Sequence, residues 1–138
     1  MYPNLLVIPM REDLTKLGIK ELRTPKEVDE VITNREGTTL LVINSVCGCA
    51  AGNARPAVKL ALQHHILPDN LTTVFAGQDQ EATAQARSYI SDYPASSPSI
   101  ALFKDGKLAN MIQRSQIEGR TPEQIATDLV QAFDTYCQ

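Results

Sequence analysis

A short apolar segment, Thr38–Asn44 with the sequence TTLLVIN, constrains the fold more than any other part of the chain. Its side chains are apolar or β-branched at nearly every position, without the polar alternation of a strand that has one face in water. The segment therefore predicts a strand that is buried on both faces of a sheet. Segments with helical periodicity precede and follow it, at residues 24–37 and 50–65, and we expect them to cover the sheet.

These flanking segments carry recognisable helix signals. Thr24 is a candidate N-cap for the first helix, with Pro25 at the first helical position and Glu27 three residues after the cap. Pro56 lies inside the second segment, so it is predicted either to kink that helix or to mark its true first turn.

The rest of the chain continues to alternate between strand and helix patterns. Asp79 is a candidate N-cap, and Thr121 opens a capping box at the last helix. After residue 65 the predicted elements are a strand at 71–77, a helix at 79–90, a strand at 99–103, a hairpin turn at 104–107, a strand at 108–112 and a helix at 121–136.

The N-terminal segment adds a short predicted helix at 9–18 and one further strand at 18–22. Alternating strands and helices are typical of an α/β fold with a mainly parallel sheet. The hairpin adds an antiparallel strand, so the expected architecture is a mixed sheet flanked by helices. A chain of 138 residues fits one domain, which we expect to span residues 1–138.

Composition narrows the class of function. The net charge is −3, which gives no indication of nucleic acid or an anionic membrane as a partner. No apolar run approaches the roughly 20 residues of a membrane span, and the N-terminus lacks the features of a secretory signal. We therefore expect a cytoplasmic protein, in which a close cysteine pair is more often catalytic or metal-binding than structural.

Two of the three cysteines form the motif Cys47-Gly48-Cys49, between the predicted strand and the following helix. Functional sites in open α/β sheets collect outside the carboxyl ends of strands, and the start of a helix stabilises a thiolate. Because the thiolate is the attacking species in disulfide exchange, we assign Cys47 as the nucleophile and Cys49 as the resolving thiol. Their disulfide would close a small ring whose strain Gly48 partly relieves, so we expect a pair that is easily reduced.

Two alternatives remain at this stage. The cysteines could be small buried residues without reactivity. They could also bind a metal, with Cys137 as a third ligand and His64 or His65 as a fourth. Adjacent histidines on a helix point about 100° apart and cannot both face one ion, so a solvated helix end explains them better. We therefore predict no metal site.

Three further positions could support the cysteine pair. Arg55 could lie near the thiolate and stabilise it, although a surface charge explains it slightly better. The Ser97-Pro98 bond, which precedes a strand, could be cis and lie beside the cysteines. Cys137, second from the end of the chain, could be an exchange partner, although a frayed, unreactive terminus is the simpler expectation.

Five stretches of the chain carry a resemblance to a known family: EGTTLLVINSVCGCAAGNARPAV, TVFAGQDQEATAQAR, SSPSIALFKDGK, EGRTPEQI and AFDTYC. With them, from VIPMREDL to Cys137, the chain resembles the bacilliredoxin family. It implies a thioredoxin-like fold with an N-terminal extension, and it places Pro98 at the cis-proline position of such proteins.

The same resemblance implies a function. Bacilliredoxins act on mixed disulfides between protein cysteines and bacillithiol, and members have been described as weak disulfide isomerases. Cys47 would attack the bacillithiol sulfur, and Cys49 or a second thiol would then release it. The implied partners are S-bacillithiolated client proteins and a low-molecular-weight thiol, and bacillithiol is a substrate, so no cofactor is expected. A general protein disulfide isomerase remains the alternative.

Overall fold

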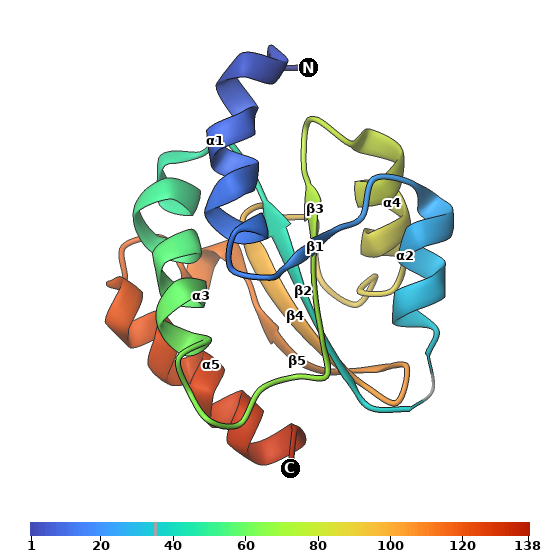
Figure 1. Cartoon of the computed structure of the whole chain (residues 1–138), viewed down its shortest axis with the longest axis vertical. Helices are drawn as coiled ribbons and strands as arrows, with labels where there is room; N and C mark the ends of the chain where they lie inside the picture. Colours follow the sequence, from blue (N-terminus) through green and yellow to red (C-terminus); the bar gives the residue numbers. More distant parts are fainter. Residues whose placement is uncertain (35) are drawn as a thin grey trace.

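The computed structural model describes residues 1–34 and 36–138 (Figure 1). Its strands are β1 (Lys20–Glu21), β2 (Thr38–Asn44), β3 (Asn70–Phe75), β4 (Ser99–Lys104) and β5 (Lys107–Ile112). Its α-helices are α1 (Asn4–Thr15), α2 (Pro25–Ile32), α3 (Arg55–Ala61), α4 (Gln80–Ser88) and α5 (Pro122–Tyr136). A π-helix, η1 (Ala50–Ala54), precedes α3, and a 3-10 helix, η2 (Arg114–Gln116), follows β5.

The helix start signals act as predicted at two of three helices. Thr24 Oγ1 accepts a hydrogen bond of 3.2 Å from the backbone N–H of Glu27, and Thr121 caps α5 through a capping box. Asp79 occupies the N-cap position of α4, but its side chain makes no capping bond. Its carboxylate instead accepts two hydrogen bonds from Arg11 of α1, so the prediction of a side-chain cap is wrong.

The helix boundaries differ from the predicted ones where backbone geometry changes. The segment predicted at 50–65 begins as the π-helix η1, and Pro56 lies in the first turn of α3, which is one of the two predicted outcomes. The helix α3 ends at Ala61 and a turn follows. The helix predicted at 24–37 ends at Ile32, and Arg35 in that segment lies outside the described residues.

The described residues form one five-stranded sheet in the order β1-β3-β2-β4-β5. β3 runs parallel to both β1 and β2, whereas β4 is antiparallel to β2 and β5 is antiparallel to β4. The predicted mixed sheet is confirmed, but the expectation that it would be mainly parallel is wrong. The segment 89–98 after α4 brings the chain back to the carboxyl end of β2, so β4 enters the sheet in the opposite direction.

The predicted hairpin is confirmed between β4 and β5. Its two turn residues, Asp105 and Gly106, have φ angles of 52° and 81°. Positive φ at both positions is what a type I′ turn requires, and this turn matches the twist of antiparallel strands. The hairpin sends β5 back toward the end of the sheet at which β4 begins.

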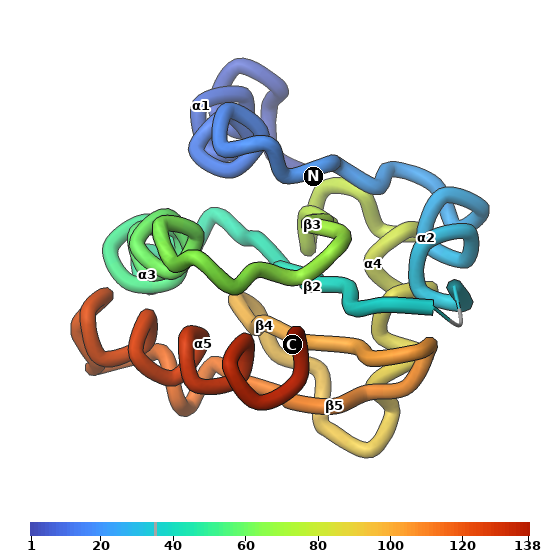
Figure 2. Tube along the Cα trace, turned by 60° about the horizontal axis from the view of Figure 1, so that its bottom comes forward, coloured from blue at the N-terminus to red at the C-terminus, as the bar shows by residue number. Residues whose placement is uncertain are grey.

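Helices cover both faces of the sheet (Figures 1 and 2). α1, α3 and α5 lie on one side, and α2 and α4 lie on the other. β2 is buried along its whole length, as the sequence predicts. Leu40 and Val42 pack into the core beneath α3 and α5, whereas Leu41 and Ile43 pack into the core beneath α2 and α4. This central strand fixes the position of the residues that follow it.

The C-terminus is more ordered than predicted. The backbone N–H of Cys137 donates a 2.8 Å hydrogen bond to Phe133 O at the end of α5, and the side chain packs against the hydrophobic core. Burial is the main cause that raises the pKa of the Cys137 thiol. The expectation of a frayed end is therefore wrong, because the last turn of α5 lies over the start of β2.

Candidate active site

Cys47 lies where β2 ends and the helical segment begins. The strand stops at Asn44, and a helical backbone starts at Gly48. The carbonyl oxygen of Cys47 accepts hydrogen bonds from the N–H groups of Ala50 and Ala51, at 3.0 and 3.2 Å. Cys47 therefore occupies the N-cap position, where the unpaired N–H groups of the first helical turn stabilise negative charge.

The two cysteines of the motif have opposite pKa shifts. The pKa of Cys47 is lowered, mainly because the Cys49 thiol and then the Cys49 backbone N–H donate hydrogen bonds to its sulfur. The positive charge of Arg114 and the N–H of Ala50 lower it further, and partial burial opposes them. The pKa of Cys49 is raised, first by burial and then by the hydrogen bond to Cys47 and the charge on its sulfur. Near neutral pH, a larger fraction of Cys47 than of Cys49 is therefore ionised to the thiolate.

Gly48 separates these cysteines and is exposed. A methyl group added at this position would meet no atom within 4 Å in the described part of the chain. The fold of the reduced protein therefore does not require glycine here for steric reasons. The predicted role of Gly48, relief of strain in the Cys47–Cys49 ring, concerns the disulfide form and stays a prediction.

Arg55 is neither a surface charge nor a neighbour that lowers the pKa of the Cys47 thiol. Its side chain is only 5% exposed, and Nη1 donates hydrogen bonds to Asn44 Oδ1 at 2.9 Å and Ser45 O at 3.0 Å. Its Nε pairs with Asp13 Oδ2 of α1 at 3.0 Å. The surface-charge interpretation is therefore wrong, because the turn after β2 and the N-terminal helix surround the guanidinium, and Arg55 is not among the groups that shift the pKa of Cys47. It holds the backbone that leads into Cys47.

The loop before β4 lies at the same end of the sheet. The Ser97-Pro98 peptide bond is cis, as the sequence and the resemblance suggested. Pro98 is buried, and Ser99, the first residue of β4, pairs with Ile43 near the end of β2. Register therefore brings this loop beside the turn that carries Cys47.

A surface cavity with a volume of ≈ 380 Å³ opens at Cys47. We call it the Cys47 hollow. Besides the small or apolar residues Val46, Ala76 and Gly77, it is lined by Tyr2, Ser45, Cys47, Arg87, Ser97 and Arg114. The hollow thus joins the cysteine motif, the end of β3, helix α4, the loop before β4 and the segment after β5.

Two of these lining residues, Arg87 and Arg114, were not anticipated from the sequence. The position of Arg114 could have been inferred from the predicted hairpin. Ile100 pairs with Ile112, and because the two strands are antiparallel, Arg114, two residues after Ile112, lies level with Pro98, two residues before Ile100. No pattern in the sequence marks Arg87, since its place depends on how α4 packs against the sheet.

The metal-binding alternative needs Cys137 close to the cysteine pair. The Cys137 thiol lies against the side chain of Thr38, at the start of β2, whereas Cys47 follows the end of that strand. At ~3.3 Å per residue the two ends of β2 are roughly 20 Å apart. His64 pairs with Asp134 of α5, at 2.7 Å. Within residues 1–34 and 36–138, no three His, Cys, Asp or Glu side chains converge on a possible metal position.

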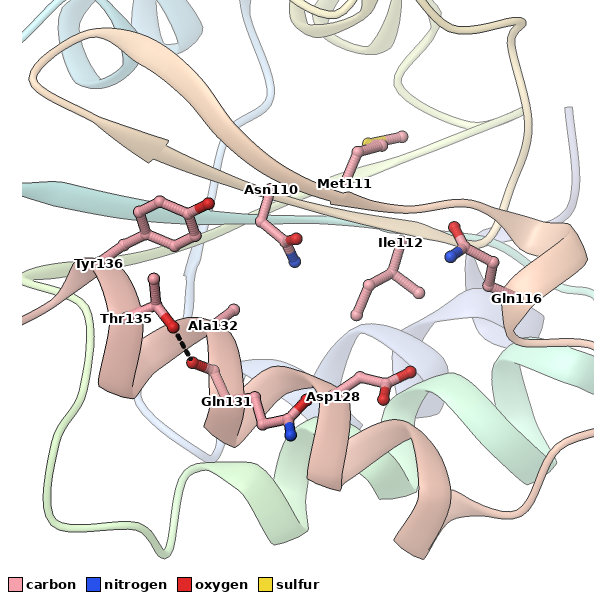
Figure 3. Close-up of a pocket in the computed structure, with 9 residues that line it drawn as sticks. All are labelled: Asn110, Met111, Ile112, Gln116, Asp128, Gln131, Ala132, Thr135 and Tyr136. Atoms are coloured by element: carbon pink, nitrogen blue, oxygen red, sulfur yellow. Dashed lines mark hydrogen bonds between the residues drawn. The ribbon is translucent and has the colours of Figure 1, made fainter.

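A second hollow, of ≈ 400 Å³, lies between β5 and α5 (Figure 3). Its labelled lining includes Asn110, Asp128 and Tyr136, and the hydroxyl of Thr135 is bound to the backbone of Gln131 at 2.8 Å. None of the residues predicted to form the site lines it, and it carries no thiol. The residues predicted to react therefore lie at the Cys47 hollow and not at this second one.

Among residues 1–34 and 36–138, none of the helices has both the length and the apolar character that a membrane span requires.

Comparison with known sequences agrees with this arrangement. A family model described as Disulphide isomerase matches residues 2–137. A bacilliredoxin of Koribacter versatilis (strain Ellin345) is 54% identical, over 99% of this chain and 94% of its own length. Bacilliredoxins of Salinibacter ruber and Staphylococcus aureus are 57% and 49% identical; they match 99% and 100% of this chain and 81% and 94% of their own lengths.

Solved structures with the same architecture include thioredoxins. Thioredoxin of Fasciola hepatica superimposes with a TM-score of 0.59 at 19% identity and covers 86% of this chain and 99% of its own. Thioredoxin O2 of Arabidopsis thaliana in the oxidised state gives a TM-score of 0.58 at 14% identity and covers 86% and 96%. At such low identity the likeness shows the fold alone, which is the thioredoxin fold with α1 as an N-terminal addition.

Proposed function

The chain belongs to the bacilliredoxin family, and on that premise we propose that it removes bacillithiol from protein cysteines by thiol–disulfide exchange at Cys47. Family membership and the thioredoxin fold make it a thiol–disulfide oxidoreductase. The observation that carries the finer proposal is the opposite pKa shift of two cysteines in contact, which supports separate roles for Cys47 and Cys49. The proposed setting is the cytoplasm, where thiols are kept reduced.

In the first step, the Cys47 thiolate attacks the bacillithiol sulfur of a mixed disulfide. The sulfur–sulfur bond to the client breaks, a bond from Cys47 to bacillithiol forms, and the client cysteine leaves as a thiolate that takes a proton from water. The lowered pKa of Cys47 keeps more of the nucleophile ionised near neutral pH.

In the second step, Cys49 gives its proton to water and attacks the Cys47 sulfur, which breaks the bond between Cys47 and bacillithiol. Bacillithiol leaves as a thiolate, and Cys47 and Cys49 form a disulfide. Once the charge on Cys47 has gone into the new bond, one of the causes that raise the pKa of Cys49 is removed. Two molecules of a low-molecular-weight thiol, or one dithiol reductant, must then supply two electrons and two protons to restore the pair, and they are themselves oxidised to a disulfide. The loop of Ser97 and Pro98, beside Cys47, is suited to contact the extended backbone of a client.

The assignment of roles is tested by trapping. With a bacillithiolated client protein as substrate, Cys49→Ser is expected to accumulate one bacillithiol on Cys47, because no resolving thiol is present to release it. Intact-protein and peptide mass spectrometry would show the added mass and its position. The matched control, Cys137→Ser, is expected to turn over like the parent protein. An adduct on Cys49 in the Cys47→Ser variant, with none on Cys47 in Cys49→Ser, would reverse the roles.

A general protein disulfide isomerase is the second candidate, and the description of the matching family model favours considering it. The two functions are separated by comparing the rate on a bacillithiolated client with the rate on a scrambled disulfide protein. We expect the bacillithiolated client to react faster. A faster rate on the scrambled protein would favour the isomerase.

A further inference from the structure

The Cys47 hollow is positively charged at its wall. Arg87 of α4 and Arg114 of η2 both line it, and none of its lining residues among the described part of the chain is acidic. This differs from the protein as a whole, whose net charge is −3. Two arginines around one small cavity beside a nucleophile call for an explanation beyond surface solubility.

Arg87 has hydrogen-bonding capacity that the protein does not use. Its Nε is buried and has no hydrogen-bond partner in the described residues, and its Nη2 reaches Ser96 O only at 3.5 Å. An unpaired polar group shielded from water destabilises the protein, and more so when it is charged. Its Nη1 makes no hydrogen bond among residues 1–34 and 36–138, and Arg87 lines the hollow, so this nitrogen is available to an acceptor that enters there.

Arg114 is held in place but keeps donor capacity. Its Nη1 donates to Ser97 O at 3.3 Å and its Nε pairs with Glu118 at 3.2 Å, so Nη2 makes no hydrogen bond among residues 1–34 and 36–138. Glu118 is 62% exposed and does not line the hollow, so water weakens its pairing with Arg114. The hydrogen bond to Ser97, in the loop before β4, therefore holds the Arg114 guanidinium at the hollow that Cys47 also lines.

Stabilising the Cys47 thiolate does not account for both arginines. Arg114 does lower the pKa of Cys47, but Arg87 is not among the groups that shift it. A thiolate nucleophile also repels any negatively charged reactant that approaches it. Cations that flank the thiolate would offset this repulsion and hold the negative group of the reactant away from the sulfur atoms.

We propose that the Cys47 hollow is an anion subsite, in which Arg87 and Arg114 hold a carboxylate of the low-molecular-weight thiol that exchanges with Cys47. The inference deepens the proposed function and rests on it for the role of Cys47. Its volume of ≈ 380 Å³ suits a small molecule, since small-molecule sites are typically about 300–1,000 Å³. Arginine is well suited to a carboxylate because its planar fork donates two parallel hydrogen bonds.

The test uses one client peptide with a single cysteine, linked in turn to 3-mercaptopropionate, 2-mercaptoethanol or cysteamine. These thiols differ mainly in a terminal group that is negative, neutral or positive. Transfer of each to Cys47 is measured by mass spectrometry in a Cys49→Ser background. Arg87→Gln and Arg114→Gln are each expected to slow transfer of 3-mercaptopropionate several-fold more than transfer of 2-mercaptoethanol. The double variant is expected to show about a tenfold loss of this preference.

Lys104→Gln is the matched control, because it removes one positive charge at the opposite end of β4. It is expected to leave the preference unchanged. The neutral thiol reports on folding and on general reactivity of Cys47 in every variant, and Arg87→Lys, which keeps the charge, is expected to retain part of the preference. Equal losses for all three thiols, or no loss, would overturn the anion subsite.

Failure of the proposed function would look different. If bacillithiol formed no adduct on Cys47 while the two arginines still controlled the preference for the negative thiol, the subsite would stand and its natural thiol would be another anionic one. If bacillithiol transferred normally and the arginines had no effect on charge preference, the function would stand and the subsite would fail.

Discussion

At the scale of single residues, the site depends on an asymmetry between two neighbouring thiols. Cys47 accepts hydrogen bonds at the start of a helical segment, and Cys49 supplies two of them, from its thiol and from its backbone N–H, while burial raises the pKa of Cys49 itself. The lowered pKa of Cys47 means that its thiolate persists to lower pH than that of an ordinary cysteine. The difference between the two pKa values therefore depends on the hydrogen bond that the Cys49 side chain donates to Cys47. Substitutions at position 49 can separate this role as a donor from the role of Cys49 as the resolving thiol.

Replacing Cys49 by alanine is expected to raise the pKa of Cys47, because the first cause of its lowering is the Cys49 thiol. The midpoint of the pH profile for alkylation of Cys47 by iodoacetamide should move to higher pH. Cys49→Ser retains an O–H donor, so its midpoint should lie between those of Cys49→Ala and the parent. Peptide mass spectrometry in a Cys137→Ser background assigns the label to Cys47. An unchanged or lowered midpoint in Cys49→Ala would contradict the assigned cause.

At the scale of elements, the turn between β2 and η1 is fixed by a buried side-chain network. Asn44 Oδ1 accepts from Arg55 at 2.9 Å and from the N–H of Ser45 at 2.9 Å, while Asn44 Nδ2 donates to Met10 O of α1 at 3.2 Å. Arg55 adds the pairing with Asp13 of the same helix. The end of β2, the start of α3 and helix α1 are therefore joined directly beneath the cysteine motif.

Arg55→Met is expected to lower the free energy of unfolding by about 2–4 kcal/mol, because it leaves buried acceptors on Asn44 and Ser45 without their donor. Asp13→Asn should cost less than about 1 kcal/mol, since the Asp13 side chain is 45% exposed and its ion pair is weakened by water. Urea denaturation followed by circular dichroism measures both. Lys59→Met, an exposed position on α3, is the control and should change stability little. A loss for Arg55→Met no larger than the control's would show that the network does not stabilise the turn.

At the scale of the whole molecule, the N-terminal helix is connected to distant parts of the chain. Arg11 of α1 donates to Asp79 Oδ2 at 2.7 Å and Oδ1 at 3.2 Å, binds Glu21 of β1, and lies 5.1 Å from the centre of the Phe75 ring. The backbone of Tyr2 is bonded in both directions to the side chain of Gln78, at 2.9 and 2.8 Å. These contacts bring the first residues of the chain to the edge of the Cys47 hollow.

Arg11→Met is expected to lower the free energy of unfolding by about 2–4 kcal/mol, because it leaves the partly buried carboxylates of Glu21 and Asp79 without their main cation. Thermal and urea denaturation measure the loss. Lys16→Met on the same helix removes an equal charge from a side chain that is 62% exposed, so we expect a change within about 0.5 kcal/mol. Equal effects of the two substitutions would indicate a general charge effect and not the specific contacts of Arg11.

Features that depend on residues close together in the chain could be predicted from the amino-acid sequence. The burial of β2, the caps at Thr24 and Thr121 and the hairpin at Asp105-Gly106 all follow from side-chain periodicity or from backbone preferences over a few residues. The placement of Cys47 after a strand and before a helix belongs to the same class, since both elements are encoded next to it.

Features that join distant segments could not be predicted in this way, because they depend on how the folded chain packs. The antiparallel direction of β4, the burial of Arg55 against Asp13, and the arrival of Arg87 and Arg114 at one cavity each depend on which elements pack together. An arginine has the same local pattern whether it ends in water, beneath a turn or beside a thiolate. Its surroundings are set by the packing of the sheet and its helices, so its contribution to the site becomes visible only in the folded chain.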